Sequence, residues 1–526
     1  MVNFRAALFN RFAVLIFGFC PRNFSVSRFG ALPIRSRPRR IMMRIFYRTL
    51  LQIAAAALVG CTVGPDYVEP DSELSLDIVS EDRFYRDENL WKEATPADKL
   101  PKGDWWSVFN DEILNDLLKL CRDNSPTLAS AFYKVEKARE AVNIDAADLY
   151  PQANGSAAFT KTERSHNFTG SSTYEKWLLG MGFTWDLDLF GRVRSMIDAD
   201  TADAQAQLYA YNSLMLSIQT SVAVEYFTLR QYSSEVDLLI RTLDVRRKQT
   251  LLVRRRVKLD YANELDLQRA LQQEYEAAAQ LATLERQIAV SKNRLAILIG
   301  VAPSRLMMND APLSEVLPKM PAAVPSQLLE RRPDIAEAER KVYAANARVG
   351  VAQAGFFPTV SISANTDLTA NNVDKLIQAS SFAWGVSPQI YIPIFQAGRI
   401  YAQKRVALAA HKESLEEYKA AVLSAIGEVE NALSEINYLE REYDKRTFVT
   451  KASLKIQELT LKQYEQGYVD YFSVSDAQRL ALENERSQIR LRGDRFRACV
   501  ALIGALGGGW NVADGEAPEG AKTRAL

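Results

Sequence analysis

Residues 192–258 read RVRSMIDADTADAQAQLYAYNSLMLSIQTSVAVEYFTLRQYSSEVDLLIRTLDVRRKQTLLVRRRVK, with no glycine and no proline. Glycine and proline are the residues that most readily interrupt a helix, so this stretch predicts one continuous helix. At 1.5 Å per residue the helix would extend ~100 Å, several times the width of a small domain. It therefore cannot be an ordinary element of a globular core.

Apolar residues recur in this stretch with the heptad spacing of a coiled coil. They are Leu208, Tyr211, Met215, Ile218, Val222, Leu229, Tyr232, Val236, Leu239 and Leu243, and Glu225 interrupts them once. The same register returns later in Leu415, Tyr418, Val422, Ala425, Val429, Ala432, Ile436, Leu439 and Tyr443. Both stretches are therefore expected to pack against other helices along most of their length.

The chain also matches itself at one constant offset. The matched pairs lie 207 residues apart and include Pro126 with Pro333, Pro151 with Pro358, Gly191 with Gly398, Tyr261 with Tyr468, and Gly300 with Gly507. A single offset without net insertion indicates a tandem duplication. We predict two structural repeats, residues 105–300 and 312–507, with a linker at 301–311 and a tail at 508–526.

Each repeat reads as helix, strand, strand, very long helix, helix. Pro126 suits the first turn of a helix, and a helix does not readily pass Pro151, so these residues bound a first helix at 126–150. Its counterpart covers 333–357, and a further unbroken helix covers 264–299. The two shorter helices of a repeat, stacked end to end, nearly match the long one, which predicts a wall of long helices.

The second strand of each repeat alternates between apolar residues and small or polar ones. The apolar faces are Trp177, Leu179, Met181, Phe183, Trp185, Leu187 and Leu189, and then Phe382, Trp384, Val386, Pro388, Ile390, Ile392 and Ile394. Such strands exceed the length of about 9–11 residues that crosses a bilayer at a tilt. A soluble sandwich is the alternative. Four strands per chain can neither form a sandwich nor close a barrel alone, so their open edges favour closure by further copies of the chain.

The N-terminal region carries the pattern of a secretion signal. From Met42 it reads MMRIFYRTLLQIAAAALVGC, in which basic residues precede an apolar run that is too short to cross ~30 Å of hydrocarbon. Leu58-Val59-Gly60-Cys61 is similar to the lipobox of bacterial lipoproteins, which implies cleavage after Gly60 and a diacylglyceryl group on Cys61. An ordinary signal peptide with an incidental cysteine is the alternative.

We assign residues 1–60 to an upstream extension and a lipoprotein signal peptide, and 61–104 to a lipid-anchored N-terminal segment. Translation is expected to start at Met42 or Met43. Beyond Cys61 no window approaches the length of uninterrupted apolar sequence that a transmembrane helix needs, so none is predicted there.

The composition argues against several classes of function. The 65 Lys and Arg residues nearly balance the 64 Asp and Glu residues, so the chain has no net attraction to nucleic acid, and Arg254-Arg255-Arg256 is interpreted as a solvated helix face. The two histidines, His166 and His411, and the four scattered cysteines lack zinc or redox spacing. Gly-x-Gly-x-x-Gly, a phosphate loop and Gly-x-Ser-x-Gly are all absent. We expect no enzyme activity, no metal and no cofactor.

Six motifs in a fixed order carry a resemblance to a known family. They are CTVGPDYVEP (61–70), Trp105-Trp106 with Phe109-Asn110-Asp111, WDLDLFGR (185–192), LLERRPDI (328–335), AGFFP (354–358), and QYEQG (463–467) leading into Asp476-Ala477-Gln478. Together they resemble the TolC-like outer-membrane efflux factors, in the OprM/NodT-type outer-membrane lipoprotein branch. The resemblance covers nearly all of the chain after Cys61.

The resemblance implies a mostly α-helical fold with a membrane β-barrel contribution. Three copies, each with four strands and long coiled-coil helices, would close a twelve-stranded outer-membrane barrel above an α-helical barrel in the periplasm. Such a homotrimer is the channel of a tripartite efflux system for small-molecule export. A periplasmic adaptor (membrane fusion) protein and an inner-membrane pump, usually of the resistance-nodulation-division (RND) class, would complete the system. A periplasmic coiled-coil scaffold that does not span the membrane is the alternative.

By the same resemblance, the periplasmic tips are the two helix–helix turns at Asp260-Tyr261 and Gly467-Tyr468, where the adaptor would dock. Gly467 suits the left-handed backbone of a tight turn, and Asp260 is a tolerated substitute at the equivalent place.

The resemblance also implies a constricted aperture just beyond these turns. Asp476 matches a ring of aspartates, and three copies would make a negative constriction that favours cations. Ser473 stands where another relative aspartate would lie. Asp266 matches a residue that some relatives tie to a tyrosine and an arginine. Tyr464 supplies that tyrosine, whereas Val469 occupies the arginine position, so the ionic half of the tie is absent or rebuilt.

Overall fold

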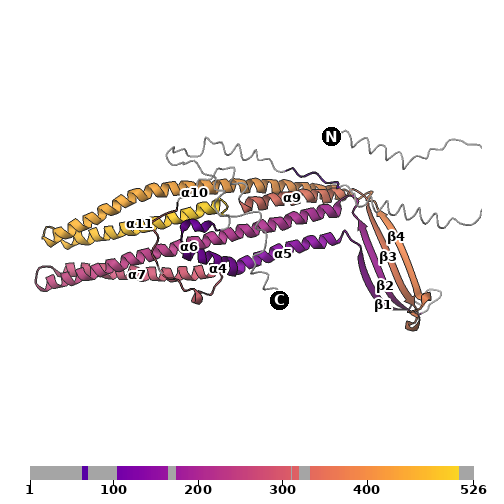
Figure 1. Cartoon of the computed structure of the whole chain (residues 1–526), viewed down its shortest axis with the longest axis horizontal. Helices are drawn as coiled ribbons and strands as arrows, with labels where there is room; N and C mark the ends of the chain where they lie inside the picture. Colours follow the sequence, from indigo (N-terminus) through magenta and orange to yellow (C-terminus); the bar gives the residue numbers. More distant parts are fainter. Residues whose placement is uncertain (1–61, 69–103, 164–172, 310, 319–331, 509–526) are drawn as a thin grey trace, which may run out of the picture. The chain divides into compact units, whose positions relative to one another are not determined.

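The computed structural model describes residues 62–68, 104–163, 173–309, 311–318 and 332–508 (Figure 1). Cys61, most of the predicted N-terminal segment and nearly all of the tail lie outside the described residues. The elements in chain order are η2 (Trp105–Phe109), α4 (Glu112–Asn124), α5 (Pro126–Ala147), β1 (Gln152–Glu163), β2 (Thr173–Leu187), α6 (Arg192–Lys258), α7 (Glu264–Leu298), η3 (Pro303–Arg305), α9 (Pro333–Ala354), β3 (Thr359–Ala370), η4 (Val373–Lys375), η5 (Ala379–Ser381), β4 (Phe382–Tyr391), α10 (Arg399–Glu465) and α11 (Tyr471–Ala505).

The two repeats have the same order of elements. The long helices α6 and α10 each contain 67 residues, and α7 and α11 each contain 35. Gly191 and Gly398, with φ of 76° and 83°, stand at the N-caps of α6 and α10, where the chain leaves a strand and turns into a helix. The tandem repeat and the mostly helical fold are therefore confirmed, whereas the boundaries assigned to the domains stay predictions.

The helices pack lengthwise, as the heptad pattern predicts. Helix α6 packs against α5, α7, α9 and α11, and α10 packs against α9 and α11. Glu225, which interrupts the heptad, accepts a 2.6 Å hydrogen bond from the buried Ser291 hydroxyl of α7. The interruption thus marks a polar contact between helices rather than a break in packing.

A buried ionic cluster joins the two repeats partway along the helices. Glu235 of α6 is fully buried, and its carboxylate accepts hydrogen bonds from Arg486 (2.9 and 3.0 Å) and Arg490 (3.2 and 3.3 Å) of α11. Arg486 also donates to Gln280 of α7 at 3.0 Å. We call Glu235, Arg486 and Arg490 the mid-helix clamp.

All four strands form one antiparallel sheet in the order β1-β2-β3-β4. The outer edges of β1 and β4 have no strand partner among the described residues. Apolar side chains of the alternating pattern, among them Met181 and Trp384, are exposed in the single chain. The predicted alternation continues to Ile394, but β4 ends at Tyr391.

A core to which both repeats contribute lies where η2 and α4 meet α6 and α11, around the buried Trp105 and Trp106. The Tyr226 hydroxyl donates to Asp111 at 2.5 Å, and Arg230 donates to the Tyr226 oxygen at 2.9 Å. Arg230 also donates to the carbonyl of Ala311, so one buried guanidinium fixes the linker to α6.

Cys121 and Cys499 are both buried and free. Burial raises the pKa of each thiol to about 11.

A short N-terminal segment, residues 62–68, packs on the start of α6 and on α9. A Cβ placed on Gly191 would lie 2.8 Å from the Cα of Thr62, and one placed on Gly64 would lie 3.1 Å from the Cα of Gly350. Glycine is required at these close approaches because any side chain would displace the segment.

Among the described residues, none of the helices combines the length and the apolar character that crossing a membrane requires.

Candidate functional site

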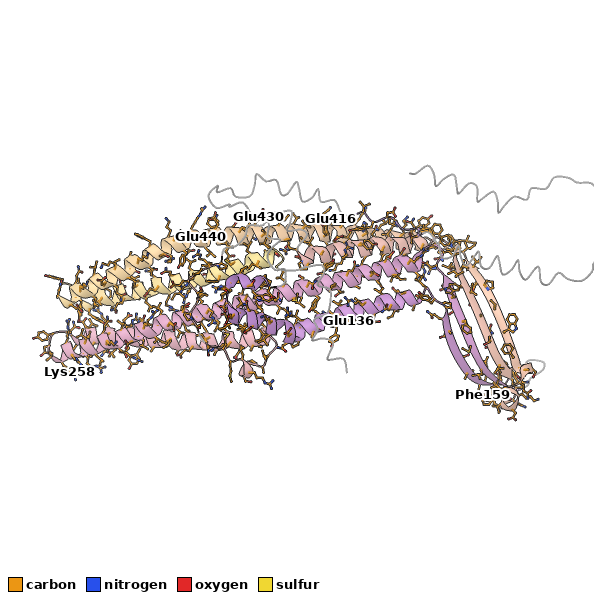
Figure 2. All side chains as sticks on the ribbon, in the orientation of Figure 1. Glu136, Phe159, Lys258, Glu416, Glu430 and Glu440 are labelled. Atoms are coloured by element: carbon orange, nitrogen blue, oxygen red, sulfur yellow. The ribbon has the colours of Figure 1, made fainter. Side chains whose placement is uncertain are left out.

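The two helix–helix turns lie at the same end of the long helices (Figure 1), near Lys258, the last residue of α6 (Figure 2). Asp260 (φ 60°) and Gly467 (φ 82°) both adopt the left-handed conformation. In each turn the next residue, Tyr261 or Tyr468, donates its N–H to a carbonyl of the preceding helix at 2.9 Å. These two tyrosines are 81% and 78% exposed. The turns therefore present matched aromatic tips, which suit protein contact.

Each turn ends in the same side-chain cap. Asn263 accepts from the backbone N–H of Asp266 at 2.8 Å, and Asp470 accepts from that of Ser473 at 3.0 Å. The Ser473 hydroxyl donates to Asp470 at 2.7 Å. The serine that stands in place of a relative's aspartate thus supports the start of α11.

The two helical hairpins, α6–α7 and α10–α11, meet just behind the turns in a small apolar cluster. Its buried members are Val253, Ala270, Tyr471 and Val474, with Tyr464 packed against them. The rings of Tyr464 and Tyr471 are 5.5 Å apart. Burial, with the nearby Tyr464, raises the pKa of Tyr471 to about 12, so its hydroxyl stays neutral at physiological pH.

The structure places Tyr464 and Asp266 on different hairpins at this site. The Asp266 carboxylate lies 3.8 Å from Arg269, one turn along α7. Among the described residues, no hydrogen bond joins the Tyr464 hydroxyl to Asp266. That the ionic half of the tie is absent or rebuilt, with Val469 at the arginine position, stays a prediction.

Asp476 carries its own counter-charge. Arg479, one turn along α11, donates to the Asp476 carboxylate at 2.8 Å and approaches Glu483 at 3.4 Å. Asp476 is half exposed, and the hydrogen bond to its carboxylate, together with its negative charge, raises the pKa of Arg479. With Arg479 beside each Asp476, a ring of these aspartates would carry less net negative charge than the aspartates alone. The sequence analysis did not single out Arg479.

Two arginines that sequence reasoning did not single out also contact this site. The guanidinium carbon of Arg256 lies 5.1 Å from the ring centroid of Tyr464, and that of Arg269 lies 5.1 Å from the ring centroid of Phe472. Arg254 and Arg255 are exposed, as predicted, but Arg256 is half-buried. No local sequence pattern could have distinguished Arg256 from its exposed neighbours, because its partner lies on the other hairpin.

A second charged cluster lies where α5, α6 and α9 meet. Arg348 of α9 pairs with Asp203 and lies 3.7 Å from Asp200, both of α6. Burial and the neighbouring Asp145 carboxyl raise the pKa of Asp200 to about 6, against the opposing pull of Arg348. In the part of the chain that the structure describes, no group of three metal-ligating side chains converges.

The chain matches known proteins over most of its length. The outer membrane efflux protein family matches it twice, at residues 117–301 and 324–508, again 207 residues apart. The cation efflux system protein CusC of Escherichia coli O6:H1 is 30% identical over 464 residues, which cover 87% of this chain and 97% of that protein. The solvent efflux pump outer membrane protein SrpC of Pseudomonas putida is 29% identical over 470 residues, covering 89% and 99%.

The solved structure of the outer-membrane channel OprN superimposes with a TM-score of 0.74 at 28% identity, covering 85% of this chain and 99% of that one. These matches confirm the resemblance read from the motifs and the expected location in the outer membrane. The chain belongs to the outer membrane efflux protein family and is an outer-membrane channel component of an efflux system.

Proposed function

We propose that three copies of this chain enclose one continuous duct from the periplasm to the exterior. This proposal rests on strand edges and apolar helix surfaces that are exposed in the single chain. Within the described parts of the chain, the sheet has two open edges, β1 and β4, that a neighbouring copy's β4 and β1 would cover. Joined this way, three sheets of four strands would form a closed cylinder.

The internal repeat indicates which helices would meet between copies. Helix α9 packs on both α6 and α10, whereas its repeat counterpart α5 packs on α6. In Figure 1, α5 and α10 lie on opposite sides of the α6–α9 pair. The repeat equivalent of the α6–α9 contact is then α10 against α5 of the next copy. Exposed apolar residues on both helices, such as Ile144 and Val406, would be covered there.

A disulfide test follows from this equivalence. A Cβ on Gly350 would lie 3.4 Å from the Cβ of Ser195, which is close to disulfide geometry. The residues 207 positions away are Asn143 and Ala402, both exposed. Oxidising the Asn143→Cys, Ala402→Cys double variant should give covalent dimers and trimers on a non-reducing gel. Asn143→Cys paired with Lys451→Cys is the control, and a double variant that stays monomeric refutes the arrangement.

A lipid on Cys61 would hold the duct in the membrane. The packing of Thr62, the residue after Cys61, on Gly191 supports this, because Gly191 lies at the boundary between sheet and helices. Metabolic labelling with palmitate should mark the wild type and Cys121→Ser but not Cys61→Ser. Label that persists in Cys61→Ser would exclude this anchor.

The tips at Asp260-Tyr261 and Gly467-Tyr468 would dock a periplasmic adaptor, and an inner-membrane pump of the RND class would supply the energy. CusC and SrpC are named for a cation efflux system and a solvent efflux pump, so channels of this family serve chemically different cargo. We propose small-molecule export with selectivity set by the pump. Tyr261→Ala with Tyr468→Ala should abolish co-purification with the adaptor while the channel remains trimeric.

Asp266, Tyr464 and Asp476 would line or brace the closed aperture. Asp476→Ala should enlarge the single-channel conductance in planar bilayers or weaken block by polyvalent cations. Unchanged conductance and unchanged block would remove Asp476 from the constriction.

A further inference from the structure

We propose that Arg256 and Arg269 hold the two hairpins together through the faces of Tyr464 and Phe472, and so keep the aperture closed. This proposal rests on the channel function proposed above. We call the two pairs, Arg256–Tyr464 and Arg269–Phe472, the tip clasps.

Each clasp joins the first hairpin to the second. Arg256 lies in the last turn of α6 and reaches Tyr464 in the last turn of α10, whereas Arg269 and Phe472 lie near the starts of α7 and α11. A guanidinium within about 6 Å of an aromatic centroid is attracted by the negative face of the ring. Both distances, 5.1 Å, satisfy this condition.

The chemistry of the partners favours the ring face over a hydrogen bond. Phe472 has no polar side-chain atom, so its face is the only group it can offer to Arg269. The Asp266 carboxylate, 3.8 Å from Arg269, holds that arginine near the ring and acts as a positioning residue. Val469 brings no charge to the site.

The clasps lie beside the tip turns, at the same level as the apolar cluster to which Tyr464 and Tyr471 belong. Farther from the turns, the 2.9 Å hydrogen bond from Gln478 to Gln249 joins the same helices. Separation of the tips must therefore break the clasps, whereas the helices beyond Gln478 and Gln249 can stay packed.

The test separates the ring face from the hydroxyl in purified full-length protein in planar bilayers. Tyr464→Phe keeps the ring, and its channels should conduct within about twofold of wild type. Tyr464→Leu removes the ring and should increase the proportion of open channels. The double variant Arg256→Gln, Arg269→Gln should shift the ratio of open to closed channels by about tenfold. Arg254→Gln is the matched control, since Arg254 is an exposed arginine at the same helix end. The proposal fails if Tyr464→Phe opens as fully as Tyr464→Leu, or if the double variant behaves as Arg254→Gln does.

A second measurement does not depend on conduction. Spin labels at Ala262→Cys and Val469→Cys report the distance between the two tips, and this distance should lengthen or broaden in the double arginine variant. If the distance changes but no variant forms channels, the proposed duct is wrong and the clasps stand. If channels form but neither conductance nor distance changes, the clasps are wrong and the duct stands.

Discussion

Replacing Glu235 with glutamine should lower the free energy of unfolding more than any comparable substitution on the surface of α6. The variant keeps the shape of the side chain and removes its charge. The guanidinium groups of Arg486 and Arg490 then lose the carboxylate that they contact, at a position where the Glu235 side chain is fully buried.

The magnitude follows from the exposure of each partner. Removing one member of a buried ion pair costs about 3–5 kcal/mol. Arg490 is 53% exposed and can turn to water, and Arg486 keeps its 3.0 Å bond to Gln280. These two facts put the expected loss in the free energy of unfolding at the lower end, about 3 kcal/mol.

Urea unfolding, followed by circular dichroism at 222 nm at fixed protein concentration, measures the loss. The control is Asp244→Asn, on the same helix, where the partner Lys248 is 74% exposed and the expected loss is below about 0.5 kcal/mol. If Glu235→Gln loses no more than Asp244→Asn, the mid-helix clamp contributes nothing measurable and the reasoning is wrong.

Three further outcomes are expected. The folded-state pKa of Asp200 is raised to about 6 from 3.8, so the stability that its protonated form contributes is complete below pH 3.8 and is lost as the pH rises through 6. Asp200→Asn should therefore remove the fall in melting temperature between pH 4 and 6, and the variant should melt at a higher temperature than wild type at pH 7. Asp260→Gly should stabilise the first tip by up to about 1 kcal/mol, since glycine adopts φ > 0 without strain, and a lower melting temperature would contradict this. Cys121 and Cys499, buried and with pKa values of about 11, should resist a maleimide at pH 7.5 until the protein is unfolded, as mass spectrometry would record.

The sequence predicted the long helices well because their signals are local. The run from Arg192 to Lys258 has no breaker, and the structure makes it one helix with these bounds. The tip turns were equally readable, since Gly467 and Asp260 are residues that tolerate a left-handed backbone. The end of β4 was misjudged because the side-chain alternation continues past Tyr391, where the strand ends.

The contacts of the candidate site were less predictable, because they depend on how one hairpin aligns with another. Arg256 looks like its exposed neighbours until α10 supplies Tyr464. Glu235 has no sequence feature that marks it as buried, since its partners lie in the other repeat. Arg479 is the exception: its spacing from Asp476 on one helix face was visible, and it was overlooked.

The uninterrupted course of α6 between the mid-helix clamp and the tip has a mechanical consequence. A straight segment from Glu235 to Lys258 spans about 35 Å, so a tilt of about 5° around the clamp carries its end about 3 Å. Glu235 would then be the point about which this stiff helical segment tilts. A partner that pushes sideways on the far end could widen the proposed passage without unfolding a turn of the helix.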